Sequence, residues 1–150
     1  MAALFAFLHH LAAFLLFAAL IVQFVLIRST LTLESARRLQ TYDRVYGIAA
    51  VLLLVIGFLR VFHFEKGAYY YFHSWPFIAK LSLFVIIGLI SIVPTREFLR
   101  WGPALKAGQV PPVSPERIKS IRSIIHYEMV GVVLILLCAA LMAKGVGAMP

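Results

Sequence analysis

The sequence predicts an all-α fold, an integral membrane four-helix bundle with both termini on the outer side (N-out/C-out). Of the 150 residues, 63% are hydrophobic and only 13% are charged, which would leave a soluble domain with far too much apolar surface. Four apolar stretches are each long enough to cross a hydrocarbon core about 30 Å thick. Basic residues gather in alternate linkers between these stretches. We therefore expect a single transmembrane domain, 1–150, surrounded by the lipid bilayer.

The first two spans are expected at 4–27 and 45–62. The first stretch lacks a basic n-region and a small-residue cleavage site, so we interpret it as a helix that stays in the protein rather than as a signal peptide. Residues 29–44 are rich in polar and basic side chains and are expected to form a linker. The aromatic segment 60–73 suits the headgroup layer, where a tyrosine ring can keep its hydroxyl in water.

The third span is expected at 75–94. Pro76 suits the first turn of a helix, and Pro94 predicts a sharp end. The polar segment 95–114 contains two adjacent prolines, so it is expected to form a loop.

The fourth helix is expected to begin at Ser114-Pro115-Glu116, with Ser114 as the N-cap and Pro115 at the first helical position. Its first turns carry several basic residues, so it starts in water and spans the membrane over 124–143. Gly145 is expected to end it.

The formal net charge of +8 is interpreted as orientation within the membrane, not as a site for nucleic acid. The opposite side has only Arg60, Lys66 and Lys144, so the positive-inside rule places both termini outside. The basic residues of the two inner linkers are Arg28, Arg37, Arg38, Arg44, Arg96, Arg100, Lys106, Arg117, Lys119 and Arg122.

The histidines are the main functional signal, because four of the five are expected near the outer face. A haem b needs axial ligands from facing helices and an apolar slot. The chain has one cysteine and no Cys-x-x-Cys-His run, which excludes a thiolate metal site and covalent c-type haem. The alternative is that each histidine sits singly in the interface. The outer histidines are His9, His10, His63 and His73, and the inner one is His126.

His9 is the first candidate ligand, because it shares a helix face with small or polar residues that suit close helix contact. His10 lies on a phenylalanine-rich face, toward lipid or a porphyrin, and is the second candidate. His63 or His73 would complete the coordination of the metal. A second, inner haem on His126 is not favoured, because no other histidine lies on that side.

Two cations near the outer face are candidate partners for haem propionates or another anionic ligand. Lys80 sits about two turns inside its span, where an ammonium group is costly without a partner. Arg60 lies near the end of the preceding span, and for both residues the alternative is that the side chain extends to the headgroups. Near the inner side, Glu128 is a polar intramembrane candidate, either functional or paired with Arg44 or Arg122.

Several short segments resemble the landmarks of HemJ-type protoporphyrinogen oxidases, which are small haem-containing bacterial membrane proteins. The resemblance implies that His9 matches the first-helix histidine, Lys80 the third-helix lysine and Glu128 the fourth-helix carboxylate. The HemJ type has a histidine where this chain has Ile78, so His73 would have to substitute for it. The segments are Leu8-His-His-Leu-Ala-Ala-Phe14, Phe17-Ala-Ala-Leu20, Arg44-Val-Tyr46 with Gly57, Trp75 with Lys80-Leu81, and Tyr127-Glu128.

Taken whole, the chain resembles still more an uncharacterised bacterial inner-membrane family, a domain of unknown function that begins with the same His-His-Leu pattern. This resemblance implies a multi-pass protein of the bacterial inner membrane and carries no activity with it.

The function predicted from the sequence is a haem b-binding membrane protein that transfers electrons, with porphyrinogen or quinone as small-molecule partner; whether it is an enzyme stays open. A second hypothesis is a metal or proton-coupled transport subunit whose outer histidines collect a cation such as copper. A third is a structural partner subunit without a ligand. The small residues Ala12, Ala13 and Ala19 predict a face for self-association as a dimer or higher oligomer.

Overall fold

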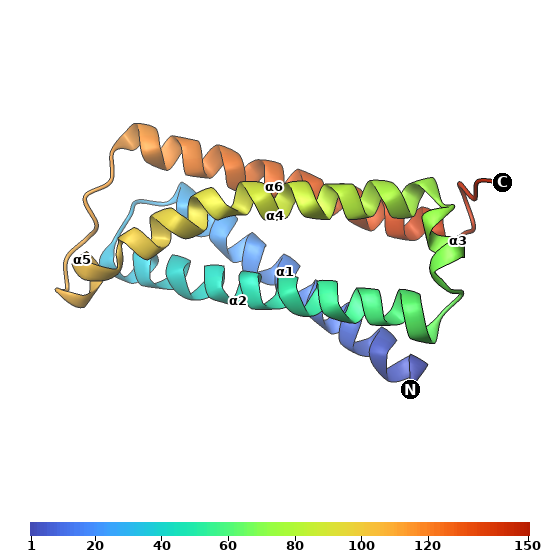
Figure 1. Ribbon diagram of the computed structural model, residues 1–150. Helices are drawn as coiled ribbons and strands as arrows, with labels where there is room; N and C mark the ends of the chain where they lie inside the picture. Colours follow the sequence, from blue (N-terminus) through green and yellow to red (C-terminus); the bar gives the residue numbers. More distant parts are fainter.

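The computed structural model describes residues 1–150 and contains helices but no strands (Figure 1). Each of four long helices is long and apolar enough to cross a membrane, which confirms the predicted all-α membrane bundle. The long helices are α1 (Ala2–Arg28), α2 (Leu33–Leu59), α4 (Trp75–Arg100) and α6 (Pro115–Ala143). The short elements are the π-helix η1 (Arg60–Phe64), α3 (Ala68–Phe72) and α5 (Gly102–Lys106).

The four long helices form two antiparallel pairs, α1 with α2 and α4 with α6 (Figure 1). Helix α1 also packs on α6, and α2 approaches α4, whereas the diagonal pairs have no close backbone approach. Both termini and α3 lie at one end of the bundle, and α5 lies at the other (Figure 1). We name these the outer end and the inner end, after the orientation that the basic residues predict.

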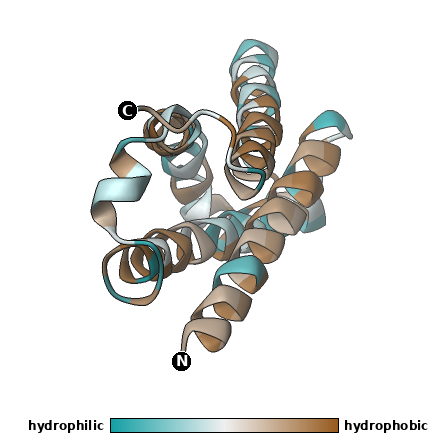
Figure 2. Cartoon of the chain, turned by 90° about the vertical axis from the view of Figure 1, so that its right-hand side faces the viewer, coloured by the Kyte–Doolittle hydropathy of each residue, from teal (hydrophilic) through white to brown (hydrophobic).

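The lateral surface of the bundle is apolar, as lipid contact requires. Large exposed hydrophobic side chains occur on all four long helices, for example Phe14, Val51, Leu89 and Val133. Figure 2, which views the bundle from its outer end, shows the hydrophobic colour over much of each helix. Since water would not tolerate so much apolar surface, the bundle is built for a bilayer.

The tightest packing lies in the inner half of the bundle. Leu39 on α2, Phe98 on α4, and Ile121 and Ile125 on α6 are almost fully buried there. The small residues Ala12 and Ala19 of α1, predicted to mediate self-association, are buried within the single chain. That prediction is wrong for these two residues, because their small side chains let α1 approach its neighbours inside the bundle.

Helix α2 begins twelve residues before the predicted span, so the linker predicted at 29–44 is wrong from Leu33 onward. The helix starts with a capping box, in which Thr32 accepts from the Ser35 backbone at 3.1 Å and Ser35 accepts from the Thr32 backbone at 2.8 Å. Ala36 and Leu39 are buried while Arg37 and Arg38 are exposed. The polar segment is therefore an amphipathic helical extension that continues out of the membrane.

Helix α4 also continues past its predicted end at Pro94 and reaches Arg100. A proline inside a helix loses one backbone hydrogen bond and costs on the order of 3 kcal/mol. The residues that follow offset this cost, because Glu97, Phe98 and Trp101 recur at helical spacing and are all buried. The predicted loop at 95–114 is thus helical over most of its first half, including α5.

The predicted start of the fourth helix is confirmed, because the Ser114 hydroxyl accepts a hydrogen bond from the Arg117 backbone at 3.2 Å and Pro115 begins α6. Its end is confirmed as well. Gly145 follows the helix with a φ of 70°, in the left-handed region that favours glycine.

Candidate functional site

The candidate site lies at the outer end, where the ring of His9 packs against the backbone of α2. His9 is on α1, in the third turn of the helix, and is half-buried. Opposite it stands Gly57, where an added Cβ would lie 3.3 Å from His9 Cε1 and 3.7 Å from His9 Nδ1. Gly57 therefore leaves the space that the imidazole occupies. Glycine within a helix costs about 1 kcal/mol relative to alanine, so this close approach is a physical reason to keep it.

The His9 ring makes no hydrogen bond, although its Nδ1 atom is buried. Buried polar atoms nearly always have a partner, and those without one need an explanation. The neighbouring His10 behaves differently, because its ring is exposed and its Nδ1 lies 2.6 Å from the Ala6 carbonyl oxygen. Of the two adjacent histidines, His9 is the one that faces its helix neighbour with free ring nitrogens.

Two cations stand close to His9, and only one of them is paired. The positive charges of Arg60 and Lys80 both lie within electrostatic reach of the His9 ring. Arg60 forms an ion pair with Glu65, and the Tyr71 hydroxyl of α3 donates a hydrogen bond to the same carboxylate. Lys80 has neither a hydrogen bond nor an ion pair. The ring centroid of Phe77 lies 5.5 Å from Lys80 Nζ. The site therefore contains one uncompensated positive charge beside an imidazole.

Glu65 and Tyr71, at the edge of the site, each keep a single protonation state near neutral pH. Burial raises the pKa of Glu65, but the hydrogen bonds from Tyr71 and Arg60 outweigh it and leave the pKa below its ordinary value. Burial, together with the hydrogen bond to Glu65, raises the pKa of Tyr71. Near neutral pH, Glu65 is therefore an anion that orients Arg60, and Tyr71 is its neutral donor.

The π-helix η1 and the C-terminal tail shape the outer end. In η1, Val61 is buried and Arg60 is half-buried, while Phe62 and His63 are exposed. The tail returns across the end of the bundle, since the Trp75 backbone donates to the Gly147 carbonyl at 3.2 Å and the Met149 backbone to the His73 carbonyl at 2.6 Å.

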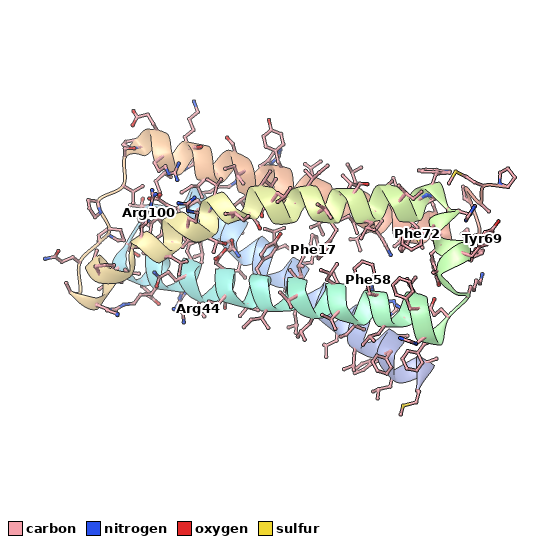
Figure 3. All side chains as sticks on the ribbon, viewed as in Figure 1. Phe17, Arg44, Phe58, Tyr69, Phe72 and Arg100 are labelled. Atoms are coloured by element: carbon pink, nitrogen blue, oxygen red, sulfur yellow. The ribbon has the colours of Figure 1, made fainter.

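Aromatic rings pack against one another at the outer end. Phe5 and Phe64 stack with their ring centroids 4.5 Å apart, which joins the start of α1 to η1. Phe58 and Phe62 stack at 6.0 Å. In Figure 3, Phe17 and Phe58 extend into the space between the ribbons of α2 and α4, and Phe72 lies near the outer end of α4.

The other outer histidines, His63 and His73, have different surroundings from His9. His63 is exposed on η1. His73 places its Nδ1 2.8 Å from the Tyr69 carbonyl oxygen and stacks on the Tyr69 ring at 3.9 Å. No three His, Cys, Asp or Glu side chains form a group that could hold a metal ion. The structure thus brings His9 together with Arg60 and Lys80 but does not gather His9, His63 and His73 into one group of three metal ligands.

Near the inner half, Glu128 is buried as predicted, with 2% exposure. Its carboxylate accepts a hydrogen bond from the Tyr46 hydroxyl at 3.3 Å. The predicted ion pair with Arg44 or Arg122 is wrong, because Arg122 instead donates to the Ile27 carbonyl at 3.4 Å and Arg44 has no carboxylate partner. His126 is exposed and lies beside the ring of Phe24 with centroids 6.2 Å apart.

Two contacts of the site were not predicted from the sequence, namely the Glu65–Tyr71 hydrogen bond and the close approach of Gly57 to His9. Glu65 and Tyr71 lie in the aromatic segment and carry no spacing signal, because their meeting depends on the turn between η1 and α3. Gly57 carries a weak signal, as a glycine inside an apolar helix marks a close approach. Arg60 and Lys80, by contrast, were predicted because cations inside apolar spans are rare.

Comparison with known proteins gives the family of the chain. The model of the family described as "Predicted membrane protein (DUF2214)" matches residues 1–147. No curated protein and no solved structure matches the chain. Because the match covers nearly the whole bundle, the chain belongs to the DUF2214 family of predicted membrane proteins.

Proposed function

We propose that the protein binds haem b at the outer end of the bundle, with His9 as an iron ligand, and that it transfers electrons in the bacterial inner membrane. The observation that carries the proposal is the buried His9 Nδ1 without a hydrogen bond, on a ring for which Gly57 leaves space. A neutral imidazole with free ring nitrogens inside a helical bundle is the usual ligand of a b-type haem.

The charges around His9 suit the other polar part of the same cofactor. A haem b carries two propionates, and Lys80, which has no ion-pair partner, would neutralise one of them. Arg60 would face the other while Glu65 and Tyr71 keep its guanidinium oriented. Phe58 and the stacked Phe5–Phe64 pair would cover the apolar edge.

When bound, haem b supplies a one-electron iron couple whose potential depends on the axial ligands and on burial. The chain itself would hold the group, exclude water with its aromatic rings and fix the charge at its rim. The resemblance to HemJ-type oxidases, in which His9, Lys80 and Glu128 match landmark residues, favours porphyrinogen or quinone as the electron partner. His63, His73 and His10 are the candidates for the second axial position.

Haem titration of the detergent-solubilised protein tests the proposal. We expect the wild-type protein to develop a Soret band distinct from that of free haem and His9→Ala to lose it. His126→Ala is the matched control, since His126 is exposed and lies at the other end of the bundle. A colourless wild-type protein, or equal binding by wild type and His9→Ala, would remove the basis of the proposal.

The same titration identifies the second ligand. His63→Ala and His73→Ala are measured separately, and the variant that converts a low-spin spectrum into a high-spin one lacks the second ligand. Unchanged spectra in both would exclude His63 and His73 from the second axial position and leave His10 as the remaining candidate.

A further inference from the structure

A groove at the inner end of the bundle, between α2 and α4, is separate from the His9 site. It consists of two adjoining cavities of about 280 Å³ and about 360 Å³. Gln40, Arg44 and Leu99 line both of them, so the cavities form one continuous depression. We call this depression the α2–α4 groove.

The mouth of the α2–α4 groove is basic. Arg37, Arg44 and Lys106 line it. Arg44 and Lys106 have no carboxylate within ion-pair distance, and Arg37 donates to the Leu105 carbonyl at 3.1 Å. Figure 3 shows Arg44 extending outward from α2 in the inner half of the bundle. These guanidinium and ammonium groups leave most of their donors free for an anion.

The single carboxylate of the groove is held away from its mouth. Asp43 is only 8% exposed, and the Thr95 hydroxyl donates to its Oδ1 at 3.1 Å. An anion that enters from the side of the bundle therefore meets Arg44 and Lys106 before it meets Asp43.

Apolar side chains continue the groove along the membrane-facing surface. Ile48, one turn from Arg44 toward the centre of the bundle, is 63% exposed, and Leu99 is 64% exposed. A free inorganic anion gains nothing from these side chains, whereas an acyl chain packs along them. Basic donors beside exposed apolar surface at a helix end match a molecule with a phosphate head and hydrocarbon tails.

Gly47 keeps the groove open. A Cβ added at Gly47 would meet no atom within 4 Å, so the backbone forms part of an unfilled wall. We infer that the α2–α4 groove is a binding site for an anionic glycerophospholipid, whose phosphate is held by Arg44, Arg37 and Lys106 and whose acyl chain lies along Ile48 and Leu99. This inference does not depend on the proposed haem site.

The experiment reconstitutes the full chain in nanodiscs of phosphatidylcholine with increasing fractions of phosphatidylglycerol and counts retained lipids by native mass spectrometry. Two variants test the site in different ways. Arg44→Gln removes a charge, and Gly47→Leu fills the groove without changing the charge. We expect each to lower the preference for phosphatidylglycerol about fivefold, the effect of losing one basic contact to an anionic lipid.

Two controls match these variants. Lys119→Gln removes an exposed basic residue at the same end but outside the groove. Gly88→Leu adds the same side chain at another helical glycine with nothing within 4 Å. Both should keep the wild-type preference. Equal losses in Arg44→Gln and Lys119→Gln would reduce the effect to general surface charge, and an unaffected Gly47→Leu variant would overturn the site.

A competition separates the lipid from free phosphate. Inorganic phosphate added in large excess should leave the retained phosphatidylglycerol in place, because it lacks the acyl contacts with Ile48 and Leu99. Displacement by inorganic phosphate would overturn the lipid as the ligand. Circular dichroism in phosphatidylcholine alone checks folding, and Lys106→Gln replaces Arg44→Gln if that variant does not fold.

Discussion

The two ends of the bundle treat their polar groups in opposite ways. At the inner end, Glu97 accepts from Arg117 at 2.9 Å and from the Trp101 indole at 3.3 Å. At the outer end, the His9 ring and the Lys80 ammonium have no hydrogen bond and no ion pair, although both are half-buried. The Glu97 carboxylate at the inner end is thus paired, whereas the outer end leaves an imidazole and a cation without partners.

This difference indicates where in the bundle unpaired polar groups lower the free energy of unfolding. A buried polar group without a partner costs about 1–3 kcal/mol, and such groups are kept mainly where a ligand can satisfy them. The inner half also has incomplete groups, since Arg122 Nε and Gln23 Nε2 lack partners. The Arg122 guanidinium still donates to the Ile27 carbonyl through Nη2, whereas the Gln23 amide, like the His9 ring, makes no side-chain hydrogen bond.

The largest expected effect is on folding at the inner end. Phe98→Ala removes a side chain that is 1% exposed and should destabilise the bundle by about 3 kcal/mol through lost packing. Phe62→Ala, on an outer side chain that is 53% exposed, should change stability by less than about 0.5 kcal/mol. Reversible unfolding in mixed detergent measures both. Equal losses at the two ends would remove the contrast in packing.

A smaller effect is expected on the ligand at the outer end. Gly57→Leu places atoms where the His9 ring lies and should weaken haem binding at least tenfold, about 1.4 kcal/mol, while the helices remain formed. Gly88→Leu, a helical glycine with free space around it, is the control. If Gly57→Leu bound haem as tightly as Gly88→Leu, the space beside Gly57 would have no role in binding.

Lys80→Met should move stability and binding in opposite directions. Removing an unpaired cation from the span should stabilise the apo protein by about 1 kcal/mol, because the ammonium no longer has to be desolvated. The same change should weaken haem binding severalfold, since a propionate loses its counter-charge. Thermal melting and haem titration on one preparation give both values. A loss of stability would mean that Lys80 has a partner in the membrane.

The smallest effect is on pH dependence. The pKa of Glu65 lies below its ordinary value in the folded state, so its contribution to stability is complete above the ordinary range for a glutamate and is lost as the pH falls through the lowered value. The size is under about 1 kcal/mol, as for a partly exposed ion pair. Wild type should therefore lose its advantage over Glu65→Gln only in strongly acidic buffer. An advantage that disappeared near neutral pH would contradict the pairing with Arg60.

The fold could be predicted because a bilayer restricts which secondary structures can span it. The bilayer core has no water to bond the backbone, so each of the four apolar stretches must form a helix, in which the backbone hydrogen bonds lie within the segment. Helix ends were harder to predict. Residues 33–44 and 95–100 look like linkers by composition, yet they continue helices on an amphipathic pattern, with Leu39 and Phe98 buried beyond the apolar stretch.

The candidate site could be predicted only in part. His9, Arg60 and Lys80 were expected near one face because the topology of the spans fixes which helix ends lie together. The contact between Glu65 and Tyr71 was not predicted, because it depends on the π-helix η1 and on side-chain directions. Spacing likewise could not show that His73 would turn to the Tyr69 carbonyl instead of toward His9.

Chemical rescue of His9→Gly tests the central claim most directly. This variant removes the imidazole but keeps the space beside Gly57 that the ring occupies. If His9 coordinates the iron, His9→Gly should bind haem at least tenfold more weakly than wild type, and added imidazole should restore both the affinity and the Soret band. Wild-type binding by His9→Gly without imidazole would contradict the assignment of His9 as the ligand.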